Sequence, residues 1–198
     1  EKYKEVIRPG IVASTNHPQV KYDDKRSYAQ FPYSDSPTKV IGYVSCHDNN
    51  TLYDKLKIAN PTATEEELVQ MNKLANTIVL TSQSIPFLHM GVEIKRTKMG
   101  VENSYNSPDS INKIDWNWKH ENKALFQYYK DLIALRENHP AFKMTSEKMI
   151  QEHLEFLSLD APLLVGYTLK NHANDDQWKN IRVYFNGDSK DIKQTLDG

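Results

Sequence analysis

The sequence predicts a mixed α/β fold in which a βαβ unit is followed by short antiparallel strands. Two apolar runs that favour β structure, residues 40–44 and 85–91, flank a stretch with helical spacing. Roughly 45 residues separate equivalent points of the two runs, which is enough for a helix to cross over and let the strands pair in parallel. After residue 150 the pattern changes to three shorter strand-like runs.

The start of the chain predicts a loop-rich lead-in, because residues 1–38 show little periodicity and contain many turn-forming residues such as Pro9 and Gly10. The first apolar run then stops at a polar cluster, residues 45–51. This is the pattern of a buried parallel strand that ends in a functional loop. A helix is expected directly afterwards, at residues 51–58.

Two amphipathic helices are predicted in the middle of the chain. Thr64 and Glu67 have the spacing of a capping box at the start of the first helix, and the second covers residues 122–136 before it stops at Pro140. Apolar residues at helical spacing follow the capping box: Leu68, Met71, Leu74, Ala75, Ile78 and Val79. Residues 93–120, which precede the second helix, are polar and turn-rich, and a loop of this length is often functional.

The three runs near the C-terminus predict antiparallel strands at residues 154–157, 163–169 and 181–185. Asn186 followed by Gly187 is a hairpin-type turn signal. So few strands would not complete a β domain. We therefore expect two parts, residues 1–150 and the beginning of a second domain at residues 151–198.

Composition excludes several classes of function. The 198 residues carry 25 basic and 26 acidic side chains, so no strong field would attract nucleic acid or an anionic membrane surface. Cys46 is the single cysteine, which excludes an internal disulfide and cysteine-rich zinc sites. No apolar run is long enough for a membrane span, and the opening residues lack the apolar core of a signal peptide. Localisation stays open, including secretion or the cell envelope.

The polar cluster after the first strand is the strongest candidate site, because α/β barrels place functional groups at the carboxyl ends of their strands. It contains Cys46, His47 and Asp48. A thiol nucleophile assisted by His47 is disfavoured, since adjacent residues in an extended segment point to opposite faces. Metal binding is also disfavoured, because the histidines show no HExxH-like spacing. The simpler alternative is that Asp48 caps the following helix.

Three segments in the same order resemble a known enzyme family. Residues 43–52, 84–93 and 103–112 are similar to the fourth conserved region, the eighth barrel strand and the following loop of type I pullulanases, in the α-amylase superfamily of glycoside hydrolases (glycoside hydrolase family 13). The resemblance implies the C-terminal part of a (β/α)8 TIM barrel, its last two strand–helix units, in residues 1–150. Residues 151–198 would then begin a truncated, antiparallel C-terminal β-sandwich domain.

The resemblance also implies roles for individual residues. Asp48 would be the catalytic carboxylate that stabilises the transition state, and His47 would bind the same sugar. Asn106 and Asp109 would line more distant glucose subsites. The expected partners are α-glucans such as pullulan, limit dextrin and maltooligosaccharides, cleaved at α-1,6 linkages, although dual α-1,4 and α-1,6 specificity stays open. No cofactor is expected, and a calcium site cannot be assigned to particular residues.

Retaining hydrolysis needs a nucleophile and a general acid, and no Arg-x-Asp motif of the family precedes Asp48. Asp23 and Asp24 fit a solvated turn better than a catalytic role. We therefore expect the isolated chain to be inactive and to self-associate through exposed barrel edges. Two alternatives remain, a non-catalytic α-glucan-binding module and a purely structural domain. Four aromatic side chains could stack on sugars, but packing is the favoured interpretation: Tyr53, Tyr105, Trp116 and Trp118.

Overall fold

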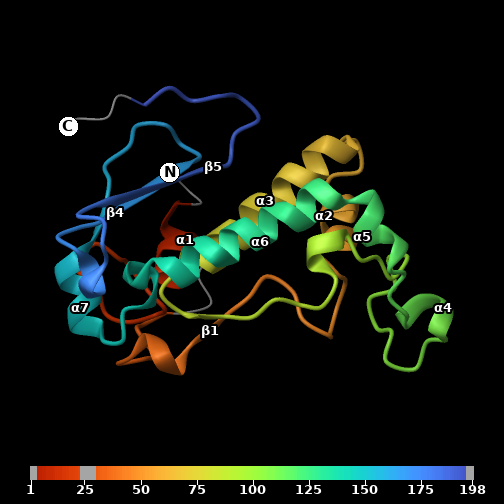
Figure 1. Ribbon diagram of the computed structural model, residues 1–198, viewed down its shortest axis with the longest axis horizontal. Helices are drawn as coiled ribbons and strands as arrows, with labels where there is room; N and C mark the ends of the chain where they lie inside the picture. The colour runs from red at the N-terminus through yellow and green to blue at the C-terminus, as the bar shows by residue number, and fades with distance from the viewer. Residues whose placement is uncertain (1–3, 23–29, 195–198) are drawn as a thin grey trace. The chain divides into compact units, whose positions relative to one another are not determined.

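A computed structural model of the chain describes residues 4–22 and 30–194 (Figure 1). The chain divides into two compact units. The first contains Glu1–Val40, Ser82–Ile85 and His139–Gly198, and the second contains Ile41–Thr81 and Pro86–Asn138. The expected division of the parent protein into parts at residue 150 stays a prediction. Asp23 and Asp24 lie outside the described residues.

The first unit begins with a helix where the sequence predicts loop, so that prediction was wrong for this part of the chain. Helix α1 spans Lys4–Ile11 and includes Pro9. Ile11 and the following Val12 and Ala13 are completely buried. Burial of this apolar end, together with a Glu5–Arg8 ion pair of 3.1 Å one turn apart, stabilises a helix that the turn-forming residues alone disfavour.

The first unit also contains the predicted antiparallel sheet, which is confirmed. Its strands are β3 (Leu154–Phe156), β4 (Leu164–Leu169) and β5 (Ile181–Asn186), in the order β3-β4-β5. Helix α7 (Glu147–His153), which the sequence did not predict, runs directly into β3. After the turn signal at Asn186 and Gly187, residues 188–194 form no further strand.

The second unit is mainly helical, with α2 (Leu52–Ala59), α3 (Glu65–Thr81) and α6 (Lys123–Asn138) at the predicted places. Helices α3 and α6 run side by side (Figure 1). The capping box is confirmed. The Thr64 N–H donates to the Glu67 carboxylate over 2.7 Å, and the Glu67 N–H donates to the Thr64 hydroxyl over 3.2 Å. The core of this unit gathers four buried residues: Leu52, Val92, Leu125 and Tyr129.

The two apolar runs form strands that are shorter than predicted, β1 (Ile41–Gly42) and β2 (Ile85–Pro86), which pair in a two-stranded sheet. The Ile85 N–H donates to the Val40 carbonyl and the Phe87 N–H to the Gly42 carbonyl, each over 2.9 Å. Both donors and both acceptors advance in the same direction, so the pairing is parallel as expected. Pro86, between the two donors, has no N–H to contribute.

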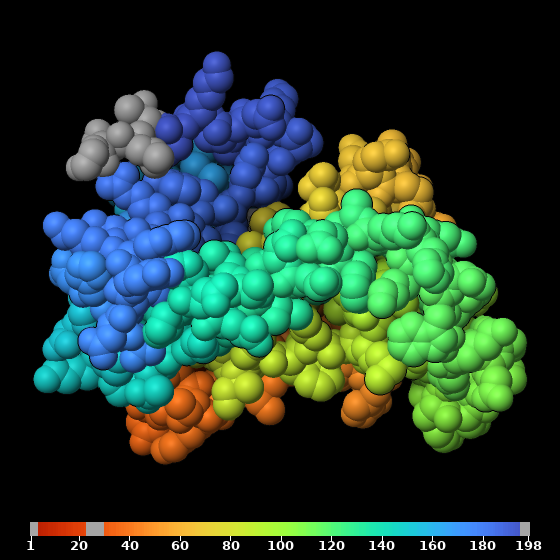
Figure 2. Space-filling model, viewed as in Figure 1, coloured from red at the N-terminus to blue at the C-terminus, as the bar shows by residue number. Residues whose placement is uncertain are grey.

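The polar segment at residues 93–120 is more ordered than a single loop. It contains α4 (Asp109–Asn112) and α5 (Asn117–Glu121), and it begins inside a 3-10 turn, η2 (Val92–Ile94). The surface of this segment, coloured yellow-green to green, is visible on the face shown in Figure 2. The remaining 3-10 turns are η1 (Pro37–Lys39), η3 (Pro140–Lys143) and η4 (Ala173–Asp175).

Candidate functional site

A small polar pocket in the second unit brings the candidate residues of the first loop together with the later polar segment. Its volume is about 190 Å³. The loop after β1 contributes His47 and Asp48, and residues 98–112 contribute the rest. The residues on this second side are Lys98, Glu102, Asn103, Ser104, Tyr105 and Asn112. Cys46 does not line the pocket, so the geometry does not favour a thiol site there.

His47 and Asp48 are open to solvent at the pocket mouth, with 84% and 76% of their side chains exposed. His47 Nδ1 lies 3.3 Å from Asp48 Oδ1. Asn49 has a left-handed backbone, with φ of 62°, and turns the chain away after the pair. Helix α2 is capped by Thr51, whose hydroxyl accepts the Asp54 N–H over 3.2 Å. The alternative that Asp48 serves as the helix cap was therefore wrong.

Lys98 supplies a cation to the lining of the pocket. The residue is 6% exposed, and its Nζ donates to the Ser104 hydroxyl over 2.7 Å. Burial lowers the pKa of this ammonium below its ordinary value, and Arg96 lowers it further, while the carboxylates of Asp48 and Asp54 act in the other direction. Asp48 therefore lies within the electrostatic reach of a partly desolvated cation.

Asn112, the last residue of α4, also lines the pocket and fixes the backbone around it. Its side-chain amide donates to the Ser104 and Ser107 carbonyls over 2.6 and 2.9 Å. Its own carbonyl accepts from the Arg96 guanidinium over 2.7 Å. A side chain at Gly91 would place its Cβ 2.7 Å from Arg96 Cβ, so glycine is needed where Arg96 crosses the chain.

Asn106 and Asp109 are exposed and do not line this pocket. Both are close to it in sequence, since Asn106 follows the lining residue Tyr105 and Asp109 begins the helix that ends at Asn112. Their assignment to more distant subsites stays a prediction. Lys98 was missed at the sequence level, because one lysine in a charged segment gives no signal of burial beside a carboxylate.

Two of the four aromatic side chains considered at the sequence level are open to solvent, so they are not core residues within the part of the chain that the structure describes. Tyr105 is 83% exposed and lines the pocket, and Trp116 is 63% exposed. Tyr53 is held in place, because its hydroxyl donates to Glu65 over 2.8 Å. Tyr105 therefore offers an open ring face next to the His47 and Asp48 pair, the arrangement on which a sugar ring can stack.

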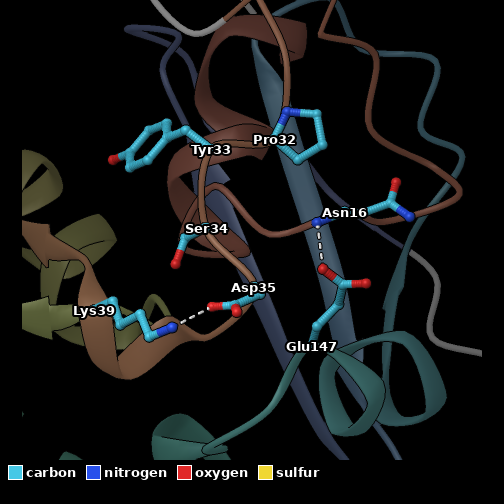
Figure 3. Close-up of a pocket in the computed structure, with 7 residues that line it drawn as sticks. All are labelled: Asn16, Pro32, Tyr33, Ser34, Asp35, Lys39 and Glu147. Atoms are coloured by element: carbon cyan, nitrogen blue, oxygen red, sulfur yellow. Dashed lines mark hydrogen bonds and ion pairs between the residues drawn. The ribbon is translucent and has the colours of Figure 1, made fainter.

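A larger pocket in the first unit, about 540 Å³, has its charged groups already engaged (Figure 3). Asp35 accepts from Lys39 over 2.7 Å, and Glu147 accepts the Asn16 N–H over 3.1 Å. Figure 3 shows these as two separate pairs at different edges of the hollow. A carboxylate that is already paired has less capacity for a ligand, so size alone does not make this pocket the better candidate.

Within residues 4–22 and 30–194, no group of three or more histidine, cysteine, aspartate or glutamate side chains could hold a metal ion. No helix in the same ranges combines the length and the apolar character that crossing a bilayer requires.

Comparison with known proteins identifies the family. Residues 150–198 match the pullulanase all-beta domain. A pullulanase of Bacillus subtilis is 40% identical over 165 residues, which are 83% of this chain and 23% of that protein. The chloroplastic pullulanase 1 of Arabidopsis thaliana is 33% identical over 79% of this chain and 18% of its own length.

Solved structures agree with these relatives. A pullulanase of Paenibacillus barengoltzii, in complex with maltohexaose and α-cyclodextrin, superposes with a TM-score of 0.88 at 37% identity, over 98% of this chain and 29% of that one. The Bacillus subtilis enzyme complexed with maltose gives a TM-score of 0.81 at 38% identity, over 90% and 24% of the two chains. The chain belongs to the pullulanase family and spans less than a third of the length of these relatives.

Proposed function

We propose that this chain is part of a pullulanase-type debranching enzyme that hydrolyses α-1,6-glucosidic linkages in pullulan and starch-like glucans by a retaining mechanism. The observation that carries the proposal is the pocket that His47, Asp48, Lys98 and Tyr105 line together. An open aromatic ring beside a carboxylate and several hydroxyl and amide groups suits a sugar better than an apolar ligand. The similarity to pullulanases, and the maltooligosaccharides bound in related structures, also support a glucan substrate.

In this proposal Asp48 is the carboxylate whose interaction with the substrate becomes stronger as the sugar ring flattens toward the transition state. An oxocarbenium-like transition state carries positive charge, which a nearby carboxylate stabilises. Asp48 is exposed and accessible for this role. His47, 3.3 Å away, contributes a hydrogen bond to the same sugar. Asn106 and Asp109 contact glucose units further from the cleavage point.

The parallel pair β1 and β2, with the helices that follow them, would be the last two strand–helix units of a (β/α)8 barrel. Residues 1–150 would belong to that barrel, and residues 151–198 would begin the C-terminal β domain. Exposed apolar side chains support this placement, since Ile41, Ile85 and Phe87 are 60%, 48% and 42% exposed. Side chains of this kind on short strands are normally covered by neighbouring strands and helices.

The isolated chain would not hydrolyse glucans, because the sequence holds no family motif for a nucleophile or a general acid before Asp48. Uncovered strand edges would favour self-association. The alternative, a non-catalytic α-glucan-binding module, would use the same pocket without cleaving the glucan.

Two measurements on the isolated chain and on a full-length enzyme that carries it test this function. The purified chain is incubated with pullulan, and we expect no release of maltotriose. Release that depends on Asp48 would contradict the proposed division of the active site. In the full-length enzyme, Asp48→Asn should lower kcat by about 100- to 1,000-fold, the usual cost of removing a group that stabilises transition-state charge.

The matched control is Asp109→Asn in the same enzyme. Asp109 is an exposed aspartate outside the pocket, so its loss should mainly raise KM and leave kcat within about threefold. Equal losses of kcat for the two variants would argue against a special role for Asp48.

A further inference from the structure

The buried carboxylate of Asp54, in the first turn of α2, connects that helix to Thr97 and to the pocket-lining residue Lys98. Asp54 is 4% exposed. Its Oδ2 accepts the Thr51 hydroxyl over 2.9 Å and the Lys98 N–H over 2.7 Å, and its Oδ1 accepts the Thr97 hydroxyl. A buried carboxylate is costly unless it is hydrogen-bonded, and these neutral donors stabilise it.

Helix capping alone does not account for this arrangement. The cap needs only the Asp54 N–H, which donates to the Thr51 hydroxyl over 3.2 Å. Two of the three bonds to the carboxylate come instead from Thr97 and Lys98, more than 40 residues later in the chain. Such bonds fix a distant segment and add nothing to the helix itself.

The segment that Asp54 fixes has a backbone that requires support. Lys95, Met99 and Gly100 all lie in the left-handed region, with φ of 59°, 57° and 76°. For residues other than glycine this conformation persists only when surrounding contacts hold it. The Met99 N–H donates to the Thr97 hydroxyl over 2.9 Å, and the Asn50 amide donates to the Gly100 carbonyl over 3.1 Å.

The position of this segment decides where the cation of the pocket lies. Lys98 follows Thr97 directly, and its Nζ reaches Ser104, so two pocket-lining residues depend on the backbone that Asp54 holds. Asp54 does not line the pocket. It could therefore affect a ligand only through Lys98 and Ser104.

We propose that Asp54 is a positioning residue of the glucan site, whose hydrogen bonds to Thr97 and Lys98 set Lys98 and Ser104 in the pocket that Asp48 also lines. This inference rests on the proposed function for the identity of the ligand. The placement of Lys98 itself does not depend on any ligand, so the two claims can be tested separately.

The first experiment measures the acylation rate of Lys98 by mass spectrometry in the full 198-residue chain. Asp54→Asn should raise this rate about tenfold relative to the exposed Lys55, because losing hydrogen bonds to a charged group frees the segment. Thr97→Val removes one of these bonds, together with the bond that the same hydroxyl accepts from the Met99 N–H, and leaves α2 unchanged, so it should act in the same direction if Asp54→Asn fails to fold.

The control is Glu65→Gln, which removes a carboxylate that binds the same segment through Lys95 over 3.2 Å at a more exposed position. This variant should leave the labelling of Lys98 unchanged. Unchanged protection of Lys98 in both Asp54→Asn and Thr97→Val would overturn the positioning role, and so would equal deprotection by Glu65→Gln.

The second experiment measures maltotriose affinity by calorimetry for Asp54→Asn, Lys98→Met and the double variant. Each single variant should bind about five- to tenfold more weakly, and the double variant should be no weaker than Lys98→Met, because coupled residues are not additive. Additive losses, or an unchanged affinity in Asp54→Asn, would overturn the proposal. Absence of binding by the unmodified chain would instead show that the isolated chain holds no preformed sugar site, and the labelling result would then decide the role of Asp54 by itself.

Discussion

The three-stranded sheet of the first unit and the polar pocket of the second are stabilised by different kinds of interaction. In the sheet, Tyr167 is fully buried and its ring centroid lies 6.2 Å from that of Phe156 and 6.0 Å from that of Phe185. The pocket depends instead on hydrogen bonds between side chains and backbone, in which Asp54 accepts the Lys98 N–H and the Asn112 amide donates to the Ser104 carbonyl. Apolar burial sets stability, whereas directed polar contacts set the position of functional groups. Substitutions should therefore separate stability from sugar binding.

The largest effect is expected from Phe156→Ala in the sheet. Phe156 is 4% exposed, packs edge-on against Tyr167 and lies under the Arg8 guanidinium at 5.0 Å. Removing a buried phenylalanine ring usually costs about 3–5 kcal/mol of unfolding free energy. Urea denaturation measures the loss. A loss below about 1 kcal/mol would show that the sheet does not depend on this core.

A second, smaller effect is expected from Asn112→Ala in the lining of the pocket. Its amide donates two hydrogen bonds to the carbonyls of Ser104 and Ser107, each bond contributing about 1 kcal/mol. Affinity for maltotriose should fall about tenfold by calorimetry, with a smaller loss of stability than in Phe156→Ala. Ser110→Ala, an exposed change on the same short helix, is the control and should bind as the unmodified chain does.

The smallest effect is a pH dependence from His17 in the first unit. This buried ring accepts the Gln19 N–H at Nδ1 over 3.2 Å, so the nitrogen that lies 3.1 Å from the Leu154 carbonyl carries the proton. Burial lowers the pKa of His17 below its ordinary 6.5, although the Leu154 carbonyl acts in the opposite direction. The unfolded chain then binds the proton more readily, so stability should decrease as the pH falls below 6.5.

His17→Gln should reduce this dependence when unfolding free energies are compared between pH 7.5 and 5.5. His89 in the second unit has a lowered pKa for the same main reason, its burial, so part of the slope should remain. An identical pH dependence of the unfolding free energy in the variant and the unmodified chain would show that His17 does not contribute to it.

The helices and strands were predicted best where local sequence signals and burial in the fold agree. The Thr64 and Glu67 spacing located the start of α3, and the strand-like runs after residue 150 located the strands β3 to β5. Helix α1 was missed because Pro9 and Gly10 are local signals for a turn, whereas the burial of Ile11 is a tertiary effect that outweighs them.

The candidate site was predictable only in its first half. His47 and Asp48 follow a strand-like run, and such positions are readily recognised. Lys98 and Asn112 could not be found in this way, because the left-handed residues beside Lys98 and the hydrogen bonds of both side chains leave no periodic pattern in the sequence. The sequence favours a packing role for Tyr105, and only the structure shows that this side chain is exposed and lines the pocket.

The most direct test of a glucan site at His47 and Asp48 is calorimetric titration of the folded chain with a pullulan-derived oligosaccharide, beside Asp48→Ala. We expect saturable binding by the unmodified chain and a loss of about tenfold or more in the variant, since Asp48 offers a charged acceptor to sugar hydroxyls at the pocket mouth. Equal affinity in the two proteins, or no binding by a chain that circular dichroism shows to be folded, would contradict the assignment of a preformed sugar site to these residues.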